Sequence, residues 1–336
     1  MRVGPLDRAE LAAARQLLAT ACAFDRADVV AEEKLFGPGP AGVARAFGAW
    51  DGDALVGVAA ISARYLRVLA VAPAARGRGA GSALLEACER GARDAGEPRL
   101  RALDQPGNYL APGIDERNVD TIAWLEKRGW RRDGDPRSNV LIAVRDNPRV
   151  TVERAEELAA AARARGYELR RARQPEYELL QAVQTEFGNA WPFEVALATG
   201  LRLHEPFTAR TVATSQSFKG PSGVHVALLD GSYCAFAAHD GNNRGLGWFG
   251  PTGTWPAHRG KGLGEALLLA CLVDVAADHE RCEVAWIGPR PFYEKAAGIV
   301  EDRRFVAMGT VAMGTVTKDE TYRLATPRNH EGREGR

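Results

Sequence analysis

The sequence contains no apolar run that approaches 18 residues, so it offers no candidate for a membrane-spanning helix. It begins Met1-Arg2-Val3-Gly4, without the charged and then apolar pattern of a secretory leader. We therefore expect a cytoplasmic protein that has no membrane partner.

An excess of charge of one sign is also lacking. The 336 residues carry a formal net charge of only +1. A nucleic-acid-binding protein would need a broad basic face, so this balance argues against a nucleic-acid partner. The hydrophobic content of 46% and the charged content of 26% are typical of a globular chain that can bury a sizeable core.

Cysteine is scarce, with five residues and neither a C-x-x-C pair nor a metal-ligand spacing. This excludes a disulfide framework, and we expect a reducing compartment and no metal. Cys88 and Cys271 lie on the apolar faces of predicted helices, where we expect them to be core residues.

A glycine-rich stretch occurs twice, at positions offset by 183 residues. Each copy follows an apolar, strand-like run and precedes an amphipathic helix, and the length of the repeat indicates two domains of ordinary size. Free N–H groups and the positive end of the helix dipole coincide at such a helix start, which is where phosphate binds. The two copies contain Arg76, Gly77, Arg78, Gly79, Ala80 and Gly81, and Arg259, Gly260, Lys261, Gly262, Leu263 and Gly264.

Two common phosphate loops are excluded by the spacing. No Gly-Lys-Ser/Thr ends either loop, and the glycines are spaced G-x-G-x-G rather than G-x-G-x-x-G. An arginine directly before the first glycine, with Pro73 or Pro256 three residues earlier, resembles the pyrophosphate loop of the GNAT N-acetyltransferase superfamily. That resemblance implies acetyl-CoA as the ligand of both loops.

The order of predicted elements also resembles that family. In each half we predict a strand, two helices, a run of strands that contains an Asp-Gly hairpin, the glycine-rich loop, a helix and a strand. The predicted strands are 2–5, 44–50, 54–62, 65–71, 99–103, 167–173, 224–229, 233–239, 245–254, 282–287 and 303–308. The predicted helices are 8–22, with Asp7 as its cap, 29–36, 82–95, 118–127, 153–165, 175–187, 192–203, 265–277 and the segment around 292–297.

The expected fold class is therefore α/β with mixed character: two tandem GNAT domains, each a mixed, mainly antiparallel twisted sheet with flanking helices. We place an N-terminal domain at 1–148, a connecting helix at 149–166, a C-terminal domain at 167–325 and a disordered tail at 326–336.

The two halves differ at one position of the family's next helix motif. Asn118, Glu126, Lys127, Gly129 and Trp130 match that motif in the first half, but Leu125 replaces its tyrosine. Phe292-Tyr293-Glu294-Lys295 keeps the tyrosine in the second half. The resemblance implies that Tyr293 gives a proton to the leaving CoA thiolate, whereas the first half binds CoA and contributes little chemistry. The alternative for Tyr293 is an aromatic residue of the core.

The resemblance implies further site residues. The strands before the loops would offer backbone groups to the acetyl oxygen, which adds Leu69, Val71, Thr252 and Thr254, together with Asn118, to the CoA-binding residues. The candidates for the catalytic base are Glu186 and Asp240, with His239 and His204 as further candidates, and a water chain or a purely structural role is the alternative for each. His258 would support CoA. The candidate substrate-binding residues are Trp191, Trp248 and His239, with Trp286 as another aromatic wall.

The predicted activity is acetyl transfer from acetyl-CoA to a primary amine of a small molecule, by a monomer or homodimer. The tandem arrangement resembles two-domain members such as mycothiol synthase and the glucosaminide N-acetyltransferases. The stretch Ile287-Gly288-Pro289 before Phe292 is most like the second group, which makes an amino sugar a candidate acceptor. A non-catalytic acyl-CoA-binding sensor or interaction module is the alternative.

Overall fold

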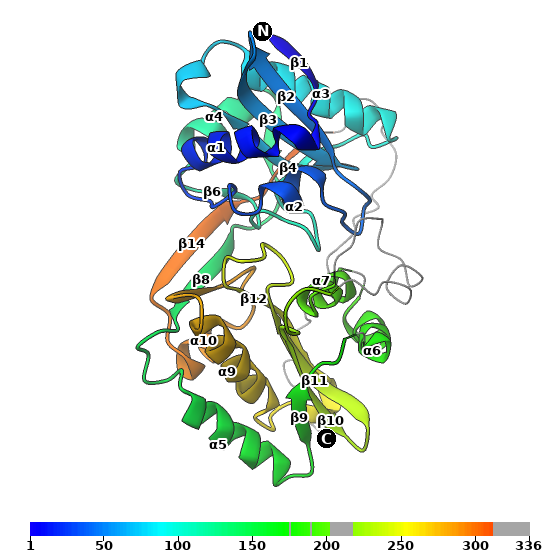
Figure 1. The fold of residues 1–336 in the computed structure, drawn as a ribbon, viewed down its shortest axis with the longest axis vertical. Helices are drawn as coiled ribbons and strands as arrows, with labels where there is room; N and C mark the ends of the chain where they lie inside the picture. Colours follow the sequence, from blue (N-terminus) through cyan, green and yellow to red (C-terminus); the bar gives the residue numbers. More distant parts are fainter. Residues whose placement is uncertain (175, 189, 202–217, 312–336) are drawn as a thin grey trace, which may run out of the picture.

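The computed structural model describes residues 1–174, 176–188, 190–201 and 218–311. In this part of the chain there are two mixed sheets, and the two halves of the molecule are stacked one above the other (Figure 1). The strands of both sheets are mainly antiparallel, and helices flank each sheet. The predicted fold class is therefore confirmed.

The first sheet is covered by two pairs of helices. Leucine and alanine side chains of α1 (Leu11–Ala21) and α2 (Ala31–Phe36) pack on one face, and those of α3 (Ala80–Asp94) and α4 (Val119–Glu126) pack on the other. The sheet has seven strands, which lie side by side in this order: β1 (Arg2–Pro5), β2 (Arg45–Asp51), β3 (Ala54–Ser62), β4 (Tyr65–Val71), β5 (Arg101–Ala102), β15 (Met308–Thr310) and β7 (Trp130–Arg132).

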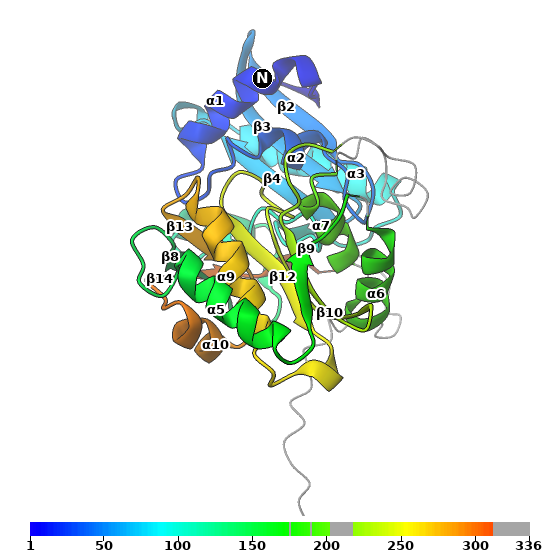
Figure 2. The same cartoon turned by 60° about the horizontal axis from the view of Figure 1, so that its bottom comes forward.

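The second sheet repeats this arrangement. The helices α5 (Val152–Arg163), α9 (Leu263–Ala276) and α10 (Arg290–Ala296) pack on one face, and α6 (Tyr177–Phe187) and α7 (Trp191–Ala198) pack on the other (Figure 2). Its eight strands lie in this order: β6 (Ile114–Asp115), β14 (Glu301–Val306), β8 (Arg137–Ala143), β13 (Arg281–Val284), β12 (Trp248–Thr254), β11 (Ser232–His239), β10 (Val224–Leu229) and β9 (Glu168–Arg171).

Most predicted elements are present, with small shifts at their ends. Asp7 caps as expected: its side chain accepts a hydrogen bond from the Ala9 N–H at 2.8 Å, and it opens a 3₁₀ turn (Arg8–Glu10) before α1. The predicted strands 99–103 and 282–287 are shorter than expected, because β5 and β13 leave their sheets after a few paired residues. The end of the predicted helix 192–203 and the predicted tail lie outside the described residues.

The two halves exchange strands. β8 comes from the first half of the sequence, but it lies between β13 and β14 in the second sheet. Conversely, β15 comes from the second half and lies between β5 and β7 in the first sheet. β8 and β14 run side by side across the junction (Figure 1). The domain limits at 148 and 167 remain a prediction, but the strand pairing crosses them.

A buried ammonium group links the halves. Lys34 of α2 is 1% exposed, and its Nζ donates to Asn108 Oδ1 at 2.7 Å, to Asn242 Oδ1 at 2.8 Å and to the Tyr109 carbonyl at 3.0 Å. Burial lowers the pKa of Lys34 to about 8, although Glu33 pairs with it at 2.6 Å. Because its partners come from both halves, this network holds them in one arrangement.

Glu194 of α7 faces the same junction. It is 5% exposed, and the backbone N–H of Gly107, from the first half, donates to it. Burial raises the pKa of this carboxyl to about 8, against the opposing influence of Lys34. The junction thus holds a carboxyl group that is far more easily protonated than an exposed glutamate.

Candidate functional site

The two glycine-rich loops have the same backbone form. Each begins with a 3₁₀ turn, Pro73–Ala75 or Pro256–His258, and each ends at a helix whose N-cap is a left-handed glycine. Gly79 has φ +90° and Gly262 has φ +76°. A Cβ on Gly79 would meet nothing within 4 Å, so the backbone conformation, rather than a neighbouring atom, requires glycine there. The starts of α3 and α9 therefore face open space with their free N–H groups.

The arginines of the loops brace them. Arg76 Nε donates to the Val71 carbonyl at 3.2 Å, and Arg259 Nε donates to the Thr254 carbonyl at 3.2 Å. Each arginine therefore ties its loop to the last residue of the preceding strand. This differs from the sequence-based expectation of phosphate contact alone and explains why both loops carry arginine at this position.

The second loop has more free positive charge than the first. In the first loop, Arg78 pairs with Asp51 at 2.7 Å. In the second, Lys261 forms no ion pair with any described carboxylate, and it lies 5.9 Å from the ring centre of Tyr167. Arg165 adds another guanidinium there, because its Nη1 donates to the Lys261 carbonyl at 2.7 Å. We expect the second loop to attract a phosphate group more strongly.

The strand before each loop diverges from its parallel neighbour. In β4, Tyr65 and Leu66 pair with β5, and in β12, Trp248 and Phe249 pair with β13. The later residues of β4 and β12 are not paired with β5 or β13. Each strand therefore opens a wedge that ends at its glycine-rich loop, as the family resemblance implies.

The predicted oxyanion positions lie on the edges of these wedges. Leu69 and Val71 of β4 pair with β3, and Thr252 and Thr254 of β12 pair with β11. In an antiparallel pair every second residue directs its backbone N–H and C=O away from its partner strand, and in β4 and β12 this direction is toward the wedge. The Thr252 hydroxyl donates to the Phe236 carbonyl at 3.0 Å. The backbone at these residues can therefore donate to an oxygen bound in the wedge, and their side chains have structural roles.

The strand that borders each wedge has a β-bulge where it pairs with β3 or β11, at the same 183-residue offset, and the residue at the bulge differs between the halves. Arg67 is the extra residue of β4, and Gly250 lies in the irregular segment of β12. Arg67 is 0% exposed and donates to Gln105 Oε1 and to the Gly37 carbonyl, both at 2.5 Å. Burial lowers the pKa of Arg67 to about 10. By contrast, no atom of the described residues lies within 4 Å of a Cβ placed on Gly250. A buried guanidinium thus fills this place in the first half, and it is open in the second.

Leu125 and Tyr293 occupy equivalent places. The Trp124 ring lies 3.5 Å from where a Cβ on Gly81 would be, and the Phe292 ring lies 3.7 Å from the corresponding point on Gly264. The residue before Leu125 and the residue before Tyr293 therefore make the same contact with the helix that follows each loop. Leu125 and Tyr293, which are aligned in the sequence motif, thus also occupy equivalent positions in the structure.

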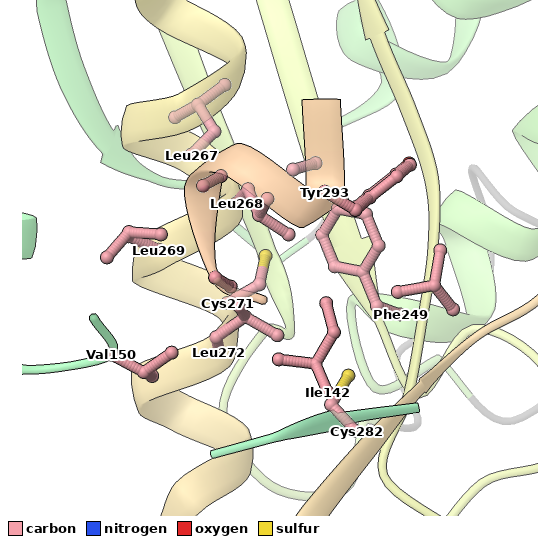
Figure 3. Packing of buried hydrophobic residues seen from close by; sticks show 14 of the residues in the cluster. Ile142, Val150, Phe249, Leu267, Leu268, Leu269, Cys271, Leu272, Cys282 and Tyr293 are labelled. Atoms are coloured by element: carbon pink, nitrogen blue, oxygen red, sulfur yellow. The ribbon is translucent and has the colours of Figure 1, made fainter. Parts of the chain in front are cut away.

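Tyr293 packs into the core of the second half. It is 5% exposed, and its ring lies 6.2 Å from that of Phe249 and 5.0 Å from that of Phe292, centre to centre (Figure 3). Burial raises the pKa of its hydroxyl above the ordinary value. No described residue hydrogen bonds with this hydroxyl, yet it is not among the fully buried polar atoms that lack a partner. The raised pKa keeps the hydroxyl protonated at neutral pH, as a proton donor requires.

The candidate bases do not converge on the wedge. Glu186 is exposed near the end of α6. Asp240 follows β11 with φ +54°, and its Oδ1 accepts a hydrogen bond from the Gly245 N–H at 3.2 Å. His204 lies outside the described residues. The assignment of Glu186 or Asp240 as the base therefore remains a prediction without a supporting contact.

His239 differs most from its predicted role in substrate binding. Its two ring nitrogens lie 3.4 Å from Asp240 and 3.3 Å from Asp274, which also binds Arg171 and His225 at 2.7 Å. Although burial disfavours its charge, these two carboxylates raise the pKa of His239 to about 9. The structure therefore makes His239 a buried cation that joins β11 to α9, at the end of that helix opposite to the loop.

The predicted aromatic walls are divided between two places. Trp191 stacks on Phe187, with ring centres 5.1 Å apart, on the α6 and α7 side of the sheet. Trp248 is 6% exposed and lies 5.9 Å from the ring of Tyr109, and Trp286 meets the same ring edge-on at 5.6 Å. Trp248 and Trp286 therefore contact the first half, which the sequence did not indicate.

The two remaining predicted CoA residues have local roles. Asn118 caps α4 without a side-chain hydrogen bond, and its backbone N–H donates to the Asp115 carbonyl at 2.9 Å. His258 Nδ1 lies 3.0 Å from the Tyr167 hydroxyl, which fixes the second loop against the end of the connecting segment.

A cavity of about 370 Å³ lies where the halves meet. Of its lining residues, Trp248 was predicted from the sequence to be a site residue, whereas Asp25, Glu283 and Arg303 were not. These three residues are far apart in the chain, and nothing local to any of them indicates a site. No group of three His, Cys, Asp or Glu side chains within the described part of the chain could hold a metal ion. No helix described is long and apolar enough to cross a membrane.

Comparison with known proteins identifies the fold. Residues 21–130 match the model of the acetyltransferase (GNAT) family. No curated protein matches the chain. A tandem GNAT protein from the clavulanic acid biosynthesis pathway is similar in structure, with 19% identity and a TM-score of 0.61 over 94% of this chain and 99% of that one.

Two other solved structures are similar over 92% of this chain. One is a GCN5-related N-acetyltransferase from Sphaerobacter thermophilus, with 17% identity, a TM-score of 0.59 and 95% of that chain covered. The other contains the glucosamine N-acetyltransferase region of a fungal multi-domain GH3 β-N-acetylglucosaminidase, with 16% identity and a TM-score of 0.64. This chain covers only 38% of that larger protein. The GNAT family model thus matches residues 21–130 of the first half, and the solved structures show that the two halves together have the fold of tandem GNAT proteins.

Proposed function

We propose that the protein is an acetyl-CoA-dependent N-acetyltransferase that acts on a primary amine of a small molecule, and that its second half carries the chemistry. The observation that supports this most is the contrast within the repeat. Both halves have the loop and the wedge, but Arg67 fills the bulge in the first half, whereas Gly250 leaves it open in the second. The second half also has a tyrosine, Tyr293, at the motif position where the first half has Leu125.

The residues of the second half fit acetyl-CoA, the donor typical of the family. Free N–H groups at the start of α9, with Lys261 and Arg165 beside them, would hold the pyrophosphate. The wedge edge from Thr252 to Thr254 would donate to the acetyl oxygen, where negative charge develops. Acetyl-CoA supplies the acetyl group as a thioester. The neutral amine nitrogen would form the new bond to the acetyl carbon as the carbon–sulfur bond breaks, and Tyr293 would give its phenolic proton to the sulfur. The proton that the nitrogen then loses would return the Tyr293 phenolate to the phenol.

The first half would bind CoA without turnover. Its loop has the same left-handed glycines, but Leu125 has no proton to give and Arg67 occupies the wedge. For this half alone, these two residues favour the alternative of a non-catalytic acyl-CoA-binding module.

An amino sugar is our candidate acceptor. Two facts support it: the resemblance of residues 287–295 to glucosaminide N-acetyltransferases, and the structural similarity to a region described as a glucosamine N-acetyltransferase. Action as a monomer or homodimer remains a prediction.

The test is release of CoA when the protein is given acetyl-CoA with amino sugars, polyamines, amino acids or peptides. We expect release above the rate of hydrolysis with at least one class of amine, together with the acetylated product by mass spectrometry. Tight acetyl-CoA binding without transfer to any of these amines would contradict the proposal and favour the binding module.

A further inference from the structure

The cavity at the junction opens on one face of the second sheet. Phe249, Cys282 and Val284 pack with α9, so the alternating residues Trp248 and Glu283 face the opposite side, toward the first half. Trp248 and Glu283 also pair with each other, as do Phe249 and Val284 one residue further on. The wedge opens beyond these two pairs. The cavity therefore lies beside the paired segment of β12 and β13, at the closed end of the wedge.

Distance along β12 separates the cavity from the CoA loop. Gly250, the open bulge, is two residues beyond Trp248, which is about 7 Å along a strand. The loop begins only after Thr254, at the far end of the same strand. A molecule in the cavity would thus approach the middle of the wedge from the side opposite to the pyrophosphate.

The ionic cluster around Arg303, part of which lines the cavity, has more carboxylates than guanidinium groups. Arg303 binds three carboxylates, at 2.8 Å for Asp25, 3.1 Å for Asp115 and 3.0 Å for Glu283. Asp115 also holds Arg117 at 2.6 Å. Three carboxylates thus share two guanidinium groups, which leaves one negative charge without a partner in this cluster.

The carboxylates of the wall are poorly stabilised. Burial raises the pKa of both Asp25 and Glu283, even though Arg303 opposes this. Arg303 is 9% exposed, and its Nε is buried without a hydrogen-bond partner. The other groups of the wall are mainly apolar or aromatic, apart from His279 and Arg26, and Arg26 is largely exposed and pairs with Asp28. A cation in the cavity would stabilise both carboxylates.

We propose that this cavity holds the acceptor through a protonated amine that is not the reacting nitrogen, with this ammonium group bound by Asp25 and Glu283, the apolar body of the acceptor against Phe24 and Trp248, and a second amine free to reach the wedge. The proposal rests on the proposed function, because the acceptor must reach the wedge of the second half. A volume of about 370 Å³ fits a molecule of monosaccharide or short diamine size and excludes a folded protein substrate. Residues of the first half would thus complete the acceptor site of the second.

The experiment uses the full chain and measures amine binding separately from turnover. The probes are glucosamine, benzylamine and 1,6-diaminohexane, each titrated calorimetrically with CoA present, with N-acetylglucosamine as an uncharged control. Three variants are compared with the natural protein: Glu283→Gln, which removes the charge, Val29→Trp, which fills the cavity from its rim, and Val43→Trp as the control. Val29 lines the cavity and is 36% exposed, whereas Val43 is 45% exposed and does not line it.

We expect at least one amine to bind the natural protein, and both Glu283→Gln and Val29→Trp to weaken that binding about ten-fold to a hundred-fold. Val43→Trp should not change it, and CoA affinity should be the same in all four proteins. If Glu283→Gln fails to fold, Val29→Trp decides. Equal amine affinity in Val29→Trp and Val43→Trp, or no binding of any probe, would overturn the proposal.

The two proposals fail in different ways. Acetyl transfer with an unchanged KM for the amine in Val29→Trp would leave the enzyme assignment intact and remove the cavity from it. Amine binding that Val29→Trp abolishes, with no transfer of acetyl groups, would leave the cavity intact and remove the enzyme assignment.

Discussion

Replacement of Glu194 by glutamine should remove a pH-dependent loss of stability. The folded-state pKa of Glu194 is raised from 4.5 to about 8. A raised pKa means that the folded protein binds the proton more tightly than the unfolded chain. The stabilisation from this group is therefore fully present below pH 4.5 and is lost as the pH rises through 8.

The size of the effect follows from the pKa. A difference between 4.5 and about 8 corresponds to roughly 5 kcal/mol across the whole window, of which about 3 kcal/mol is lost by pH 7. Glutamine keeps an oxygen that can accept the hydrogen bond from the Gly107 N–H but carries no charge at any pH. The free energy of unfolding of Glu194→Gln should therefore rise relative to that of the natural protein as the pH increases from 4.5 to 8.

The assay is urea unfolding at steps of pH between 4.5 and 8.5, with the difference between the two proteins plotted against pH. The difference cancels titrating groups that do not interact with Glu194, among them His239, whose folded-state pKa is also raised. Lys34 does interact with Glu194, so its titration contributes to the difference near pH 8. Glu186→Gln, at an exposed position of α6, is the control and should give a flat difference. A flat difference for Glu194→Gln, with equal m-values, would refute the reasoning.

Three further predictions concern the two wedges. Gly262→Asn introduces a residue that tolerates positive φ but adds a side chain at the phosphate, so it should weaken CoA binding to the second half at least ten-fold and stop turnover. Gly79→Asn should leave turnover unchanged, and both variants are tested by calorimetry and by CoA release. Tyr293→Phe should lower kcat by about 10²-fold or somewhat less, because a thiol with a pKa of about 8.5 can also leave as an anion, with the melting temperature nearly unchanged; full activity would remove the acid role. Arg67→Met should cost roughly 3 kcal/mol in urea unfolding, since the carbonyls and the amide that it binds lose their donor, without changing kcat of the folded protein; a lower kcat would place chemistry in the first half.

Local patterns in the sequence predicted most of the fold. The loops could be found because a helix start with left-handed glycines needs those residues at those positions, and Gly79 and Gly262 have the expected backbone. The equivalence of Leu125 and Tyr293 came from the resemblance of both segments to one family motif, and in the structure the aromatic residue before each packs on the third glycine of its loop. Such features depend on neighbours in the chain, so one sequence suffices to see them.

Pairing between distant segments could not be predicted in the same way. β8 contains both polar and apolar residues and β15 has only three residues, and nothing in either segment indicates which sheet it joins. Burial was equally hidden. His239 was taken for a substrate residue because its residue type suits a cleft, but its role is decided by Asp274 on another element. Arg67 was not predicted to have a role, because it is a single charged residue in an apolar strand, although its buried side chain distinguishes the two halves.

The exchanged strands explain why the halves depend on each other. Asn139 lies on β8, a strand from the first half of the sequence, yet its side chain donates to Glu283 Oε1 at 2.6 Å and accepts from the Trp286 N–H at 2.8 Å. Asp25 and Asp115 reach Arg303 from the same half. Residues 149–336 alone would therefore leave the carboxylate and the guanidinium of the cavity without half of their partners. The wedge with the open bulge thus lies in the second half, while much of the charge around the neighbouring cavity comes from the first. The first half is therefore needed even if it never transfers an acetyl group.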